Sequence, residues 1–110
     1  MTFSTLVTDL DGTLLDQNGQ IPDANLDALH HCVERNMTIV LATGRNISAT
    51  LHIAERVAQA VGDEIYLILQ DGCLLLRYPS MQVLEYHNLP LDLALAACDL
   101  LREEAQAMLL

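Results

Sequence analysis

Residues 7–14 read Val-Thr-Asp-Leu-Asp-Gly-Thr-Leu, and this is the most informative stretch of the chain. An apolar run breaks here into a glycine turn, and two acids, Asp9 and Asp11, stand two residues apart at the break. Side chains two apart on a strand point the same way, so we expect both carboxylates on one side of a strand end, close enough to repel. A cation or hydrogen-bond donors would have to offset that repulsion. The stretch therefore predicts a strand end that carries chemistry.

Strand and helix patterns alternate along the chain around this stretch. Helices are indicated by apolar residues at helical spacing, by Pro22 and Asn46 at helix starts, and by Asn36 and Gly62 at helix ends. The continuous apolar run at residues 37–42 indicates a strand that is covered on both faces, as in parallel sheets. We expect strands at residues 5–9, 37–42 and 65–69, the first of them buried, and helices at residues 23–35 and 47–61. The order β-α-β-α-β predicts an α/β fold with a parallel sheet and right-handed crossovers.

The pattern changes after residue 70. Asp71-Gly72 is typical of a turn, and residues 73–77 and 82–86 flank Pro79-Ser80 as the two strands of a β-hairpin. Residues 91–107 predict a third helix, and the last three residues are expected to begin another apolar element.

Composition restricts the partners. The formal net charge is −10, and the chain has five Arg and no Lys. Such an acidic chain is a poor nucleic-acid binder and is not attracted to anionic membranes. No uncharged apolar run approaches membrane-spanning length, and no signal peptide is indicated. The three cysteines are widely spaced, which suits a reducing compartment, so we expect a cytoplasmic protein.

Three loops follow the three expected parallel strands: residues 9–13, residues 43–45 and Asp71-Gly72. Ligands of parallel α/β sheets bind beyond the carboxyl ends of the strands, so these loops should share one rim. Each signal alone is weak, because Asp-Gly turns and strand-to-helix connections without a ligand are common. Together, in this order and spacing, they predict a binding or catalytic site.

The three loops resemble motifs of the haloacid dehalogenase (HAD) superfamily. Residues 9–15, Asp-Leu-Asp-Gly-Thr-Leu-Leu, resemble its first motif, and residues 42–45, Ala-Thr-Gly-Arg, resemble its second motif in the Cof-like phosphatase branch. Residues 69–73, Leu-Gln-Asp-Gly-Cys, are similar to the Asn-Gly-Ala stretch of that branch, with Asp71 in place of Asn. The resemblance runs from about Phe3 to the end of the chain and implies a Rossmann-like HAD core.

The resemblance implies a Mg²⁺-dependent phosphatase that acts on a small phosphorylated metabolite. Asp9 would attack phosphorus and form an aspartyl-phosphate, and Asp11 would serve as acid and base. Mg²⁺ would bind the Asp9 carboxylate and the Asp11 backbone carbonyl. Charge neutralisation of this kind is what a carboxylate attacking an anionic phosphate requires.

A phosphate-binding set follows from the same resemblance. Thr43 would hydrogen-bond the phosphoryl oxygens, and Gly12 would let backbone N–H groups approach them. Arg45 could add a positive charge, although an outward salt bridge is an equal alternative. The full set comprises Leu10, Gly12, Thr43, Gly44 and Arg45.

The chain departs from the family pattern because it contains no lysine, whereas family members carry a downstream lysine and a later acidic motif. We therefore interpret residues 1–78 as a partial core domain and residues 79–110 as a hairpin strand and the start of a cap domain, truncated. The alternative is a non-catalytic phosphate- or Mg²⁺-binding or interaction fragment that needs a partner chain. A phosphoacceptor signalling domain would also place acids at the first strand end. It would need a phosphorylated Asp after the third strand, which Asp71 could supply, and a later lysine, which the chain does not contain.

The missing elements would normally continue the sheet beyond its first strand. That strand would then be an uncovered apolar edge, which predicts self-association or strand exchange.

Overall fold

The computed structural model describes residues 2–105, which form five strands, three α-helices and two short turns, η1 and η2. The expected alternation is confirmed, and the boundaries agree with the sequence patterns to within one or two residues. In chain order the elements are β1 (Thr5–Thr8), η1 (Leu10–Leu14), α1 (Asp23–Glu34), β2 (Thr38–Ala42), α2 (Ile47–Val61), β3 (Ile65–Leu69), η2 (Gln70–Gly72), β4 (Leu74–Tyr78), β5 (Val83–Tyr86) and α3 (Leu91–Ala105).

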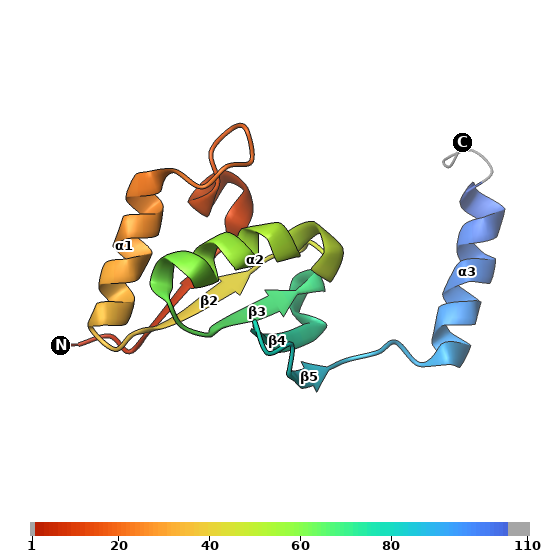
Figure 1. Cartoon of the computed structure of the whole chain (residues 1–110). Coiled ribbons are helices and arrows are strands. Elements are labelled where there is room, and N and C mark those ends of the chain that lie inside the picture. The colour runs from red at the N-terminus through yellow and green to blue at the C-terminus, as the bar shows by residue number, and fades with distance from the viewer. Residues whose placement is uncertain (1, 106–110) are drawn as a thin grey trace.

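The strands lie in one sheet in the order β1-β2-β3-β4-β5. β1, β2 and β3 are parallel, and β4 and β5 add the antiparallel hairpin. α1 and α2 pack against each other and cover one face of the parallel strands (Figure 1). Because the three parallel strands end at the same rim, the loops after β1, β2 and β3 are brought together there.

The hydrophobic core lies between this sheet face and the two helices. Alternate residues of β3 point into it, and Ile65, Leu67 and Leu69 are fully buried. The register places Leu67 beside Leu41 of β2 and opposite Leu76 of β4, so one buried row crosses three strands. This buried row fixes the register of the three strands, and the register determines where each strand ends and where its rim loop begins.

The ends of α2 follow local signals. The Asn46 side chain accepts a hydrogen bond from the Ala49 N–H at 2.9 Å, and Gly62 ends the helix in the left-handed conformation with φ 70°. The apolar spacing of this helix predicts a buried stripe of Ile47, Leu51, Ala54, Val57, Ala58 and Val61. Ala54, Val57 and Val61 are buried as expected, but Ile47, Leu51 and Ala58 are half-buried, and Thr50 and Ile53 are buried in addition. Thr50 tolerates burial because its hydroxyl donates to the Asn46 carbonyl at 2.8 Å.

β1 is not the buried strand that the sequence predicts. It is an edge strand with β2 as its one neighbour in the sheet, and its residues are exposed or half-buried. Val7 is 57% exposed, because it lies on the sheet face that α1 and α2 do not cover. The apolar pattern alone predicts burial, whereas the uncovered apolar edge predicted from the missing sheet elements of the family is confirmed.

α3 stands apart from the sheet at the end of an extended segment, residues 87–90 (Figure 1). Its leucines are exposed, among them Leu91 at 74%. The radius of gyration is 17.3 Å, compared with about 13 Å for a compact domain of this length. The expected end of this helix at residue 107 and the apolar element at 108–110 lie outside the described residues.

No helix within residues 2–105 is both long and apolar enough to cross a membrane. The division of the chain after residue 78 into core and cap stays a prediction.

Candidate functional site

The three rim loops line an open, shallow cavity of about 350 Å³. Each loop contributes one polar side chain: Asp9 follows β1, Thr43 follows β2, and Asp71 follows β3. The other residues that line the cavity are Ala42, Gly44, Ile68 and Gly72. The side chains of Asp9 and Thr43, predicted to converge from neighbouring strands, are therefore at one cavity.

Asp9 occupies the N-cap position of the turn at Leu10–Leu14, yet its side chain accepts no capping hydrogen bond. The backbone makes the turn instead: the Asp9 carbonyl accepts from the Leu14 N–H at 3.3 Å. Gly12 supplies the left-handed conformation with φ 76°, while Leu10 and Leu14 are buried as anchors. The carboxylate of Asp9 is exposed on the cavity side and is not needed to hold the turn.

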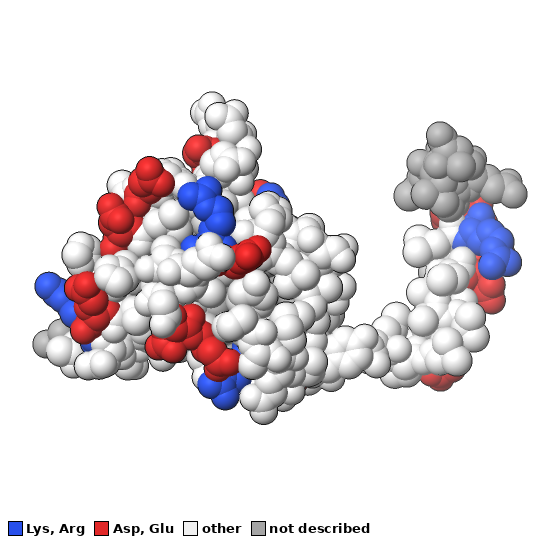
Figure 2. All heavy atoms as spheres, viewed as in Figure 1, with Lys and Arg blue, Asp and Glu red and all other residues white. Residues whose placement is uncertain are grey.

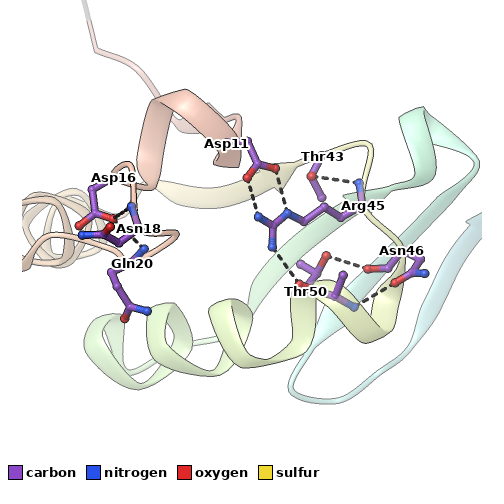
Figure 3. Close-up of polar contacts among 9 residues, drawn as sticks. Asp11, Asp16, Asn18, Gln20, Thr43, Arg45, Asn46 and Thr50 are labelled. Atoms are coloured by element: carbon purple, nitrogen blue, oxygen red, sulfur yellow. Dashed lines mark hydrogen bonds and ion pairs between the residues drawn. The ribbon is translucent and has the colours of Figure 1, made fainter.

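The side chain of Asp11 does not lie at the cavity with that of Asp9. The prediction that both side chains leave the strand in parallel is wrong, because β1 ends at Thr8 and the chain then turns sharply, with Gly12 at φ 76° directly after Asp11. Asp11 is outside the cavity lining and pairs with Arg45 (Figure 3). Arg45 Nε donates to Asp11 Oδ2 at 2.8 Å, and Arg45 Nη2 donates to Asp11 Oδ1 at 2.5 Å.

The ion pair shifts both partners toward their charged forms. The hydrogen bonds from Arg45 hold the pKa of Asp11 below its usual value, and the hydrogen bonds to Asp11 raise the pKa of Arg45. A third contact steadies the guanidinium, because Arg45 Nη1 donates to the Ala49 carbonyl at 3.2 Å. Of the two alternatives for Arg45, the salt bridge is the one that the structure contains, and its partner is Asp11.

Thr43 is nearly buried, with 7% of its surface exposed. Its hydroxyl oxygen accepts the Arg45 backbone N–H at 3.1 Å, and its own N–H donates to the Ile68 carbonyl at 2.9 Å. The hydroxyl proton is thus available for a ligand in the cavity, since the hydroxyl accepts in its contact with Arg45.

Backbone hydrogen bonds join the second and third loops. The Gln70 N–H donates to the Arg45 carbonyl at 3.0 Å, and the Asp71 N–H donates to the Thr43 carbonyl at 3.3 Å. These bonds hold Asp71 over Gly44, where an added Cβ would lie 2.8 Å from Asp71 Oδ1. Gly44 is therefore the residue that makes room for the Asp71 carboxylate.

Asp71 lines the cavity, as its place on the shared rim predicts, but sequence reasoning gave it no role in the phosphatase and considered it only as the acceptor of a signalling domain. Its position after the third parallel strand was the available signal, but an Asp-Gly pair is usually an ordinary turn. The conformation is unusual, because Asp71 has φ 56° and Gln70 before it has φ 52°. Asp tolerates the left-handed region better than most residues.

The oxygen atoms at the cavity suit a hard cation such as Mg²⁺, which binds carboxylates and carbonyls. Asp9 supplies an exposed carboxylate that is not used for capping. Within residues 2–105, no group of three or more His, Cys, Asp or Glu side chains could hold a metal ion together. Any cation held by these residues alone would retain most of its water ligands.

Charge on the helix-covered face is acidic and dispersed. Asp and Glu side chains are spread along α1 and α2 with isolated Arg between them (Figure 2). The surface in this view offers no basic stripe of the kind that nucleic-acid binding requires.

Comparison with known proteins gives a consistent result. A family model described as haloacid dehalogenase-like hydrolase matches residues 6–110. A protein of Haemophilus influenzae, described by name as a candidate phosphatase, is 32% identical over an alignment of 99 residues that covers 84% of this chain and 36% of that protein.

Solved structures agree on the fold. A phosphatase of the haloalkanoate (HAD) superfamily from Bacteroides thetaiotaomicron is 27% identical, with a TM-score of 0.76 over 91% of this chain and 35% of that one. A haloacid dehalogenase-like hydrolase from the same organism is 22% identical, with a TM-score of 0.78 over 93% of this chain and 38% of that one. The chain spans about a third of the length of these relatives.

Proposed function

This chain belongs to the haloacid dehalogenase-like hydrolase family, and from that membership we propose that it carries the nucleophile half of a Mg²⁺-dependent phosphatase. The substrate is a small phosphorylated metabolite, and the reaction passes through an aspartyl-phosphate. Because the chain spans about a third of the length of the relatives it matches, the proposal is limited to the catalytic groups that these 110 residues supply.

One observation supports the proposal above the others. The Asp9 carboxylate faces a cavity that it shares with the Thr43 hydroxyl, and the carboxylate accepts no capping hydrogen bond from its own turn. A carboxylate that is exposed at the end of a parallel strand, beside a hydroxyl donor, is placed to meet a tetrahedral oxyanion.

The proposed chemistry has two steps. An Asp9 oxygen attacks phosphorus, the bond to the ester oxygen breaks, and Asp11 donates a proton to the departing alkoxide. Water then attacks the phosphorus of the aspartyl-phosphate, Asp11 takes the proton, and Asp9 is released with inorganic phosphate. Thr43 donates a hydrogen bond to a phosphoryl oxygen. The backbone of Leu10, Gly12 and Gly44 lies beside the phosphoryl group as it binds.

Asp11 must break its ion pair with Arg45 before it can act as a general acid. Its hydrogen bonds to Arg45 favour the ionised carboxylate, whereas a general acid has to be protonated. In the proposed cycle the phosphate draws Arg45 toward itself, and the freed Asp11 takes up a proton. This exchange combines the two roles considered for Arg45, since it pairs with Asp11 before binding and with phosphate afterwards.

The cation would be held by the Asp9 carboxylate and the Asp11 backbone carbonyl. When bound, Mg²⁺ supplies charge neutralisation between the attacking carboxylate and the phosphate. Residues of this chain provide only part of the coordination, so weak binding is expected from the chain alone.

The second candidate is a phosphate- or Mg²⁺-binding or interaction fragment without turnover. It is favoured by the open cavity and by the lack of a three-ligand metal cluster within residues 2–105. Such a fragment would gain activity only with a partner chain that supplies the remaining groups.

Turnover of p-nitrophenyl phosphate with Mg²⁺ separates the two candidates. We expect little or no hydrolysis by the chain alone, and any metal-dependent hydrolysis that it shows should be lost in Asp9→Asn, because the amide cannot serve as the nucleophile. Asp27→Asn is the matched control, since it removes one exposed acid on α1 and should leave the rate unchanged. Equal background rates in the unaltered chain and Asp9→Asn would favour the binding fragment and contradict the phosphatase.

A further inference from the structure

We propose that Asp71 determines substrate specificity, and that it selects phosphate esters whose leaving group carries a hydrogen-bond donor, an ammonium above all. The inference rests on the proposed phosphatase function and adds the chemical class of the substrate. It starts from a carboxylate that lies at the cavity and has no part in the two chemical steps.

The position of Asp71 is fixed by its backbone. Its N–H donates to the Thr43 carbonyl at 3.3 Å, and the preceding Gln70 N–H donates to the Arg45 carbonyl at 3.0 Å. The left-handed conformation at φ 56° turns the side chain over Gly44, whose missing Cβ leaves the space that Asp71 Oδ1 occupies. The carboxylate is therefore held at the cavity by the loop and does not reach it by chance.

The Asp71 carboxylate has no cation of its own. It joins none of the ion pairs found among residues 2–105, whereas Asp11 nearby is paired with Arg45. Asp9 and Asp71 thus put two acidic side chains on the wall of one cavity of about 350 Å³. The side chain remains available for a ligand.

Charge decides which ligand fits. A phosphate dianion that meets Asp9 and Asp71 is repelled by both, so a simple alkyl phosphate binds poorly. An ester that carries an ammonium or hydroxyl group close to its phosphate replaces the repulsion at Asp71 with a charge-assisted hydrogen bond. Such bonds are about twice as strong as neutral ones, so the ammonium should be preferred over the hydroxyl.

Two isosteric esters test this preference: 2-aminoethyl phosphate and n-propyl phosphate, which differ by an ammonium in place of a methyl group. Binding is measured by NMR titration in the Asp9→Asn background, which removes both the turnover and the charge of Asp9. We expect the aminoethyl ester to bind about tenfold more tightly than the propyl ester. Adding Asp71→Asn should reduce that ratio to about one, because the isosteric amide tolerates the same backbone conformation but carries no charge.

The control is Asp27→Asn in the same background, which removes an exposed acid on α1 and should leave the tenfold ratio intact. Equal affinities for the two esters before Asp71 is changed, or a ratio that survives Asp71→Asn, would overturn the inference and leave the phosphatase proposal standing. Absence of binding by both esters would overturn the inference and the phosphate site together. Since the readout is a ratio within one protein, a loss of overall affinity in the variant does not imitate the expected result.

Discussion

The pair of Asp11 and Arg45 is the feature with the most consequences at the scale of single residues. It explains why the two acids of the first motif behave differently: one faces the cavity, and the other is neutralised by an arginine from the second motif. Because both partners lie at the surface, solvent screens their attraction and its contribution to stability is small. The effect of the pair on the pKa of Asp11 can be measured directly.

The carboxyl group of Asp11 should titrate below its ordinary value of 3.8. Because its pKa is lower in the folded chain, the pair stabilises the fold at neutral pH, and that contribution is lost as the pH falls through the folded pKa. Carbon-13 NMR of the side-chain carboxyl gives the midpoint directly. Arg45→Gln removes the positive partner and should return the midpoint toward 3.8; a midpoint at or above 3.8 before the substitution would contradict the observed pairing.

Single residues also show where sequence reasoning about the site stops. Asp9 and Thr43 could be placed together, because each directly follows a parallel strand and strand ends share a rim. The direction of Asp11 could not be derived, because the two-residue rule holds only while the chain remains a strand, and β1 ends at Thr8. Asp71 depends on contacts between two loops that no local pattern encodes.

Helix α2 is the element that connects the site to the core. Its first turn holds Arg45 through the Ala49 carbonyl, and its buried face packs beside α1 over the sheet. The Asn46 cap fixes where the helix starts and therefore where Arg45 is presented. Loss of the cap should therefore lower the free energy of unfolding of the whole fold.

Replacing the cap by Asn46→Ala should lower the free energy of unfolding by about 1 kcal/mol, since the Ala49 N–H loses its side-chain acceptor. Urea denaturation followed by circular dichroism measures the change. Asn46→Asp keeps an acceptor and adds a favourable charge at the helix start, so it should retain the original stability. Equal losses in both variants would show that the cap oxygen is not the cause.

At this scale the sequence was a good guide. The strands, the helices and both ends of α2 follow from short-range signals: apolar spacing, an asparagine cap and a terminal glycine. The buried stripe of α2 was misplaced, because Thr50 satisfies its hydroxyl within the helix and can then be buried. The exposure of β1 depends on which strands lie beside it, and that is a property of the complete sheet.

The whole molecule has two open sheet edges with different character. β5 carries Glu85 and a register irregularity opposite Leu75 and Leu76, both of which discourage further pairing. β1 is uncharged and regular, and it exposes Val7. We therefore propose that self-association occurs at β1.

Light scattering coupled to size-exclusion chromatography should show concentration-dependent dimers or larger species. Val7→Lys introduces a charge on the edge strand and should shift the population toward monomer. Leu93→Lys is the matched control, since it removes an exposed apolar side chain of α3, away from the sheet. A stable monomer at all concentrations, or equal effects of the two substitutions, would contradict association through β1.

The antiparallel turn at β4 determines where the chain departs toward α3. Tyr86 at the end of β5 lies opposite Leu74, which in turn lies opposite Leu69, so the departure point is at the rim where Asp9 and Thr43 stand. The tether of residues 87–90 can span no more than about 14 Å, even when fully stretched. The first turn of α3 is thereby confined to within that distance of the end of β5, on the same rim of the sheet as the cavity.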